Sequence, residues 1–313
     1  MTVIVQQSTD SNGNPQPMVY DSDTGKIIVD SNGYVINGGK RLVNVPTVSE
    51  YVSTPKTTTA GIQEAINYLF PLGGGHIKLS GGAFVIDSST PWLKTGGGNL
   101  ANSASSTNTY CLINLPSTST QSMTVYTIEG VNGMSSTGTT GFADWKASLS
   151  PRDTVIDAHL VSVPSGASSN DGYVIFGQVL PSGMSSTTPL NTSVIMRNMF
   201  FLKPDINVGS VNIGGMNTSL EYLSSFTYGM ENSDKPASYS VQSVDFSCSG
   251  YGANSAWANM LNSQGSYLAF IFGDGTAVGQ IHANMAWYSA VPFLMMELMV
   301  CSGLQLHQLC LYR

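Results

Sequence analysis

The sequence contains few charged residues: they make up 10% of its 313 residues, against about a quarter in an average globular protein. Its 12 Lys and Arg residues and 19 Asp and Glu residues give a net charge of -7. Because contacts to phosphate groups need clustered cations, this balance argues against a nucleic-acid partner. The hydrophobic fraction of 42% is large enough for a core, so we expect an ordered chain.

Cysteine is scarce as well, with four residues at positions 111, 248, 301 and 310 and no C-x-x-C pair. The pattern predicts neither a zinc site nor a dense disulfide framework, and free buried thiols are expected. Residues 1–10 contain no cation and only a short apolar run, so no secretory signal is predicted. We therefore expect an extracellular or virion-surface protein that leaves its cell without a signal peptide.

Glycine and small polar residues are abundant, and three turn signals interrupt the first 45 residues, at 10–13, 21–25 and 30–33. Asn-Gly and Thr-Gly pairs supply the positive φ angles that tight hairpins require. The sequence therefore predicts hairpin turns, with strands at 26–30 and 34–36 beside one of them. A calcium loop is the alternative for these closely spaced Asp and Asn residues, although the full EF-hand spacing is missing.

Residues 57–87 predict one short helix followed by two strands. The apolar residues of the helix recur at the spacing of one helix face: Ile62, Ala65, Ile66 and Leu69. Threonines at 57–59 offer N-cap hydroxyls, and the glycines at 73–75 end the helical segment. Strands are expected at 76–79 and 83–86, with a glycine turn between them.

The string Gly61-Ile62-Gln63-Glu64-Ala65-Ile66-Asn67, followed by Gly73 to Phe84, resembles the opening segment of the pectate-lyase-like superfamily. That superfamily includes pectin-degrading enzymes and the tailspikes of bacteriophages. The resemblance implies an all-β fold, a right-handed parallel β-helix (a solenoid) with an N-terminal capping helix. Family members commonly carry an Asp where Thr57 to Thr59 stand here, so hydroxyls replace a capping carboxylate.

Short apolar strands recur downstream, at 123–128, 154–156, 173–176, 193–196, 210–213, 220–228 and 241–246. Loops rich in Gly, Ser, Asn and Thr are expected at 96–107 and 135–140. A spacing of roughly 20 to 30 residues suits a solenoid whose coils bury a stripe against their neighbours. The spacing is irregular, and a β-sandwich is the alternative.

We divide the chain into a hairpin-rich attachment region and connector (1–55), a parallel β-helix domain (56–285) and an apolar tail (286–313). The tail is interrupted by Pro292 and Glu297, so no membrane span is expected. We predict that it caps the solenoid or forms a subunit interface. A tail foreign to the family, after a change of reading frame, is the alternative.

The densest ionisable group is Arg152-Asp153 followed by Asp157 and His159. On a strand, Asp157 and His159 face the same side, which would let the carboxylate orient the imidazole. Asp153 lies about 13 Å from Asp157 along a strand, beyond the roughly 5 to 9.5 Å of glycosidase carboxyl pairs. We take Asp157, His159 and Arg152 as candidate catalytic residues, with a surface hydrogen bond as the alternative interpretation.

Candidate ligand-binding residues are Trp145, Arg197 and Phe200. Arg197 and Lys203 flank an aromatic run, and a cation beside an aromatic ring can stack on a sugar. With 14 Tyr and 4 Trp residues among many hydroxyl and amide side chains, the surface suits neutral glycans.

Three functions are compatible with the sequence. The first is a virion-associated or cell-surface β-helix that binds polysaccharide, with a homotrimer or a larger assembly as its expected partner; its composition resembles surface proteins of thermoacidophilic archaea and their viruses. The second is a polysaccharide lyase or glycoside hydrolase, for which the resemblance implies calcium in a lyase or paired carboxyls in a hydrolase. The third is a structural protein without a ligand, and no cofactor is expected for the first or third.

Overall fold

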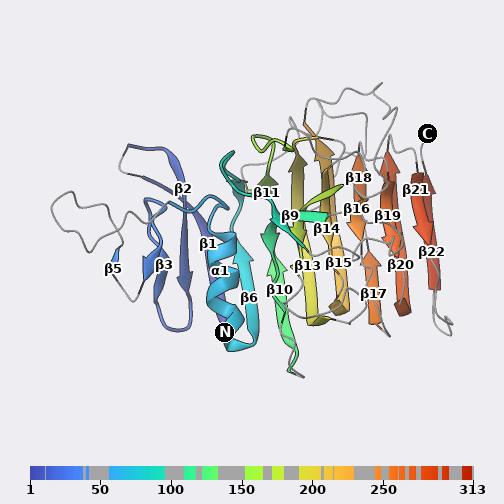
Figure 1. Cartoon of the computed structure of the whole chain (residues 1–313), viewed down its shortest axis with the longest axis horizontal. Helices are drawn as coiled ribbons and strands as arrows, with labels where there is room; N and C mark the ends of the chain where they lie inside the picture. Colours follow the sequence, from blue (N-terminus) through green and yellow to red (C-terminus); the bar gives the residue numbers. More distant parts are fainter. Residues whose placement is uncertain are drawn as a thin grey trace.

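The chain forms a β-rich structure, seen in a computed structural model (Figure 1). The structure describes residues 1–10, 12–37, 40–41, 56–95, 109–117, 122–132, 152–164, 171–179, 190–205, 208–213, 215–228, 244–247, 254–259, 261–264, 268–272, 276–287, 291–295 and 305–311. Within these ranges the one α-helix is α1 (Ile62–Leu69), followed by a 3-10 turn, η1 (Phe70–Leu72). The all-β class predicted from the sequence is confirmed at this level.

Two large sheets contain nearly all of the strands. The first sheet consists of β1 (Thr2–Thr9), β2 (Pro15–Asp21), β3 (Ile27–Val29), β6 (Gly74–Leu79), β7 (Gly82–Val85), β10 (Thr124–Glu129), β11 (Thr154–Asp157), β13 (Leu190–Lys203), β15 (Gly215–Thr227), β17 (Asn254–Asn259), β18 (Asn262–Gln264), β20 (Thr276–Trp287) and β22 (Gln305–Leu311). The second consists of β8 (Leu93–Lys94), β9 (Thr109–Asn114), β12 (Gly172–Gly177), β14 (Val208–Asn212), β16 (Val244–Ser247), β19 (Leu268–Phe272) and β21 (Val291–Met295). A separate hairpin pairs β4 (Ile36–Asn37) with β5 (Lys40–Arg41).

From β12 onward the chain passes back and forth between the two sheets. β12, β14 and β16 belong to the second sheet, whereas β13, β15 and β17 belong to the first. Each pairs in parallel with its neighbours, so that Ser193, Asn217 and Ser255 lie side by side on β13, β15 and β17. The strands expected from residue 123 to residue 246 are confirmed as β10 to β16, with β13 and β15 longer than predicted; residues 241–243 of the last expected strand lie outside the described residues.

The core lies between the two sheets. Along β10 the buried residues alternate with less buried ones, as expected for a strand with one face on a core. Phe176 of the second sheet meets Phe201 of the first edge-on, with ring centroids 6.0 Å apart. Phe201 also meets Phe246 of β16 at 6.2 Å, so a strand two places beyond β12 in the second sheet contacts the same core.

A bend crosses β13 and β15 at one level. Asn198 has φ 62° and Tyr222 has φ 53°; they lie between the aligned pairs Arg197–Glu221 and Met199–Leu223. Asparagine tolerates this left-handed conformation, whereas it costs other L-residues about 1–2 kcal/mol. The bend divides the outer face of the first sheet into a lower half, formed by β6, β10 and the first parts of β13 and β15, and an upper half, formed by β7, β11 and the second parts.

Helix α1 forms as predicted, and Ile62, Ala65, Ile66 and Leu69 are its buried residues. Thr57 Oγ1 accepts a hydrogen bond from the N–H of Gly61 and donates one to Glu64. Thr59 Oγ1 likewise accepts from the N–H of Gln63 and donates to Glu64. The two hydroxyls therefore satisfy donors at the start of the helix, and the Glu64 carboxylate ties them together.

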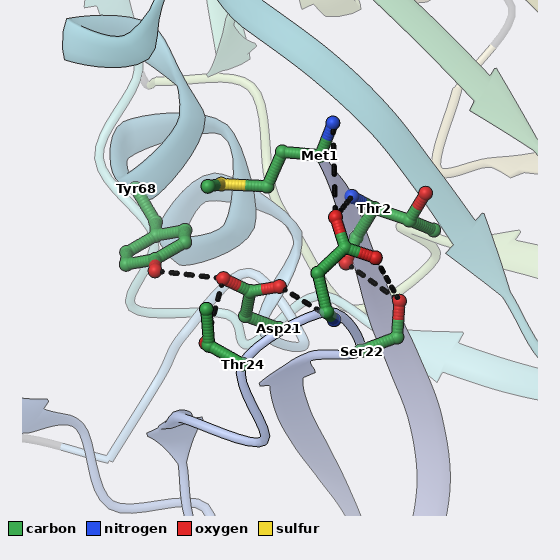
Figure 2. A network of polar contacts seen from close by, with 7 residues as sticks. Met1, Thr2, Asp21, Ser22, Thr24 and Tyr68 are labelled. Carbon is green, nitrogen blue, oxygen red and sulfur yellow. Dashed lines mark hydrogen bonds and ion pairs between the residues drawn. The ribbon is translucent and has the colours of Figure 1, made fainter.

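The three N-terminal turn signals form turns of the predicted kind. The carboxylates of Asp10, Asp21 and Asp30 each accept the N–H of the residue two positions ahead, at 2.9 Å in all three turns. Figure 2 shows the second turn, where Asp21 also accepts hydrogen bonds from Thr24 and, at 3.0 Å, from Tyr68 of α1. These hydrogen bonds explain the turns without a bound cation.

The N-terminal and C-terminal regions both continue the large sheets. β1 pairs in parallel with β6, which links the first hairpin to the sheet that follows (Figure 1). In the apolar tail, β21 pairs with β19 and β22 with β20, both in parallel. The cap or interface role of the tail stays a prediction. Among the described helical residues, no segment has the length and apolarity of a membrane span.

Candidate functional site

Asp157 and His159 come together at the end of β11. His159 Nδ1 lies 2.5 Å from Asp157 Oδ1, and the His159 N–H donates to the same oxygen at 3.0 Å. The Asp157 side chain is 12% exposed and that of His159 is 25% exposed. A carboxylate in contact with Nδ1 favours a proton on that nitrogen and orients the ring, and Nε2 of such a ring is a hydrogen-bond acceptor in the neutral form and a donor in the charged form.

Tyr228, the residue directly after β15, also belongs to this site. Its ring stacks on His159 with centroids 4.6 Å apart and an interplanar angle of 27°. Tyr228 is 47% exposed, and Val85, which pairs in register with Asp157, is 43% exposed. We call Asp157, His159 and Tyr228 the imidazole patch. The patch combines an accessible aromatic ring, that of Tyr228, with an oriented polar pair, and Val85 adds apolar surface beside it.

Tyr228 was not found from the sequence. It lies far from His159 along the chain, and only the pairing of β11 with β13 and of β13 with β15 brings the two residues together. The sequence shows only a Tyr directly after an apolar strand, and that pattern does not by itself mark a binding residue.

Arg152 does not join the patch. It lies before β11, at the opposite end from Asp157, and a four-residue strand separates its ends by about 10 Å. Asp153 is buried and its carboxylate accepts a hydrogen bond from Asn132 at 2.9 Å. The Asp157 carboxylate contacts His159 instead.

The Phe200 ring, a candidate for stacking on a sugar, is not accessible on the surface. It is 1% exposed and belongs to a small apolar cluster with Val155, Leu202 and Phe226. Its ring stacks on Phe226 at 6.1 Å. Past the bend, Phe200 and its neighbour Phe201 point to opposite faces and are both buried, so β13 is covered on both sides there. Trp145 lies outside the described residues.

Arg197 lies in a charged network on the lower half instead. Its Nε is 3.1 Å from Glu129 Oε1, and His76 Nε2 is 3.0 Å from Glu129 Oε2. Next to Arg197 on β15, Glu221 accepts a hydrogen bond from Ser219 at 2.6 Å. The contact between His76 and Glu129 was not predicted from the sequence, because the two residues become neighbours only through the pairing of β6 with β10.

In the described ranges, no three or more His, Cys, Asp or Glu side chains are grouped so that they could hold a metal ion. The calcium that the resemblance implies for a lyase therefore stays a prediction. Comparison of the chain with protein-family models, with curated proteins and with solved structures found no match.

Proposed function

We propose that the chain is a right-handed parallel β-helix of the pectate-lyase-like kind that binds polysaccharide through the imidazole patch. The fold proposal is supported by the passage of the chain between two sheets, by parallel in-register pairing between successive layers, and by a helix at Ile62–Leu69 that packs at the start of this stack. Solenoids are built from such layers, each burying a stripe against the next.

The observation that supports glycan binding best is the half-exposed Tyr228 ring stacked on His159. Sugars offer apolar ring faces that pack on aromatic side chains, and their hydroxyls bond to precisely placed polar groups. Asp157 holds His159 in place, so Nε2 can form a hydrogen bond with a sugar hydroxyl without the cost of ordering a free side chain. Val85 extends the apolar surface beside this pair.

The patch is a binding site rather than a cleavage site in this proposal. Glycosidases need two carboxyl groups in separate roles, and the patch contains one carboxylate, already bonded to His159. The low charge and the many hydroxyl and amide side chains suit a protein on a virion or cell surface that contacts neutral glycans. Cleavage by a lyase or hydrolase is the alternative that the same experiment detects.

Binding is tested by isothermal titration calorimetry against a panel of neutral and uronate polysaccharides, with new reducing ends and ultraviolet-absorbing products measured in parallel. We expect binding without cleavage, and Tyr228→Ala should weaken it about tenfold or more, as loss of a central aromatic contact does. Tyr222→Asn is the control, because it removes another tyrosine ring, 39% exposed, at the bend of β15 rather than at the patch just after that strand. Equal affinity of wild type and Tyr228→Ala would exclude this site.

A further inference from the structure

Four charged residues of alternating sign lie in one row across the lower half of the first sheet. Lys78 pairs in register with Glu129, Glu129 with Arg197, and Arg197 with Glu221. We call these four residues the charge row. They occupy adjacent strands, β6, β10, β13 and β15, about 4.8 Å apart. Their order across the sheet is plus, minus, plus, minus.

All four side chains are at least partly open on this face. Lys78 is exposed and Glu221 is of intermediate exposure; the Glu129 and Arg197 side chains are 25% and 38% exposed. The next row on the side away from the bend contains His76, Thr127, Ile195 and Ser219. Val125, still further along β10, is 43% exposed. The face is therefore mixed in polarity and charged along one line.

From this order we infer that the lower half of the first sheet is a docking surface for a second copy of the chain. A two-fold axis parallel to the strands, passing between Glu129 and Arg197, reverses the order of the charge row in the partner. Lys78 then faces Glu221 of the other copy and Glu129 faces Arg197, so each charge meets its opposite. Isologous contacts of this kind need a self-complementary surface.

The other possible two-fold arrangement is disfavoured by the same row. An axis parallel to the row would place each residue opposite its own copy, so that like charges face each other across the interface. Both axes keep the strands of the two copies along one line, which is a common packing for stacked sheets, so strand direction does not distinguish them. Charge order favours the first of these two dimers.

The four strands span about 15 Å, and the sheet continues in register from β15 into β17 and β20. A surface of this width gives a contact at the weak end of protein interfaces, where charge pairs supply specificity more than affinity. We therefore expect a concentration-dependent dimer that dissociates as salt is added. The inference does not depend on the imidazole patch, which lies in the upper half.

Sedimentation velocity of the full chain over a wide range of concentration and salt tests this inference. Lys78→Glu should weaken the dimer about tenfold, because two outer pairs become repulsive at once. Lys78→Glu combined with Glu221→Lys should restore it, since the outer pairs are then reversed. Lys94→Glu is the matched control: it makes the same change of charge at an exposed position on β8 of the second sheet, and it should leave dimerisation unchanged.

The double variant distinguishes charge pairing between two copies from a change in charge pairing within one chain. In it the new carboxylate at position 78 still lies beside Glu129, and the new ammonium at position 221 lies beside Arg197, so neither has an opposite charge as its register neighbour. Recovery can come only from the other copy. A wild type that stays monomeric, a trimer, or a double variant as weak as Lys78→Glu would each overturn the inference; thermal unfolding checks that every variant is folded.

Discussion

The glycine triplet after α1 provides a sharp test of how closely the layers approach. Gly74 has φ 96°, and a Cβ added there would lie 2.0 Å from the backbone oxygen of Val125 on β10 and less than 3 Å from two more of its backbone atoms. Gly73 has φ 84°, but a Cβ added there meets nothing within 4 Å. An alanine would therefore have a strained backbone at either position. Only at Gly74 would its Cβ also collide with the backbone of β10.

The expected costs follow from this difference. Gly73→Ala should lower the free energy of unfolding by about 1 kcal/mol, because a left-handed alanine costs about 1–2 kcal/mol and the loss of unfolded-state entropy offsets part of it. Gly74→Ala should cost at least about 3 kcal/mol, since β10 must move away and weaken its ladder hydrogen bonds, each worth about 1 kcal/mol. The bond from the Val125 N–H to the Gly73 carbonyl, 3.0 Å long, is the first affected.

Urea unfolding of the two variants measures both costs from the shift of the midpoint at constant slope. Gly73→Ala is the control, because it carries the same substitution and nearly the same backbone strain. If the two variants unfold at the same midpoint, β6 and β10 do not approach as described. A midpoint for Gly74→Ala above that of Gly73→Ala would contradict the reasoning outright.

Three further predictions concern single residues. Tyr222→Asn should raise the free energy of unfolding by about 0.5–1 kcal/mol in the same urea assay, because Asn tolerates the left-handed conformation that strains Tyr; an unchanged or lower value would argue against the bend. Desolvation acts to raise the pKa of Asp21, but hydrogen bonds from Asp23, Thr24 and Tyr68 outweigh it and hold the pKa below its ordinary value. Asp21 therefore stabilises the fold fully above about pH 4 and less as the pH falls through the lowered pKa, so the stability difference between wild type and Asp21→Asn should shrink on acidification. Burial raises the pKa of the Cys111 thiol to about 12, so mass spectrometry should find Cys111 unmodified by iodoacetamide at neutral pH in the folded chain and modified in urea.

Local structure could be predicted from the sequence because its signals are local. The periodicity of Ile62, Ala65, Ile66 and Leu69 identified α1, and the Asp and Gly residues of the N-terminal turns identified the hairpins. The Asp157–His159 contact could also be predicted, since the two residues lie two positions apart in the chain. Each of these predictions rests on residues that are close together in the chain.

The contacts that could not be predicted from the sequence depend on the register between strands that are distant in the chain. Glu129 meets His76 only because β10 pairs with β6, and Tyr228 reaches His159 only across β13. Phe200 shows the converse: an aromatic residue beside cations suggested an open surface, but β13 is covered on both sides beyond Asn198. Lys203, at the end of the same strand, is likewise fully buried. Burial of this kind is set by the segments that pack on a strand, which its own sequence does not specify.

Because the chain has few charged residues, the alignment of four of them across neighbouring strands is informative. In a chain with 10% charged residues, most positions on an open sheet face are expected to be uncharged, as they are along the row that contains Thr127, Ile195 and Ser219. Parallel in-register pairing nevertheless places four charges on one line and alternates their signs. Opposite charges side by side stabilise the sheet itself by a few tenths of a kcal/mol per pair, and that local benefit needs no particular order from one edge of the row to the other. The order from edge to edge matters only when a second surface packs against the row. The exchange of Lys78 and Glu221 tests this, because it worsens the two outer contacts within the row, with Glu129 and with Arg197, while every residue of the row still faces an opposite charge across the two-fold axis.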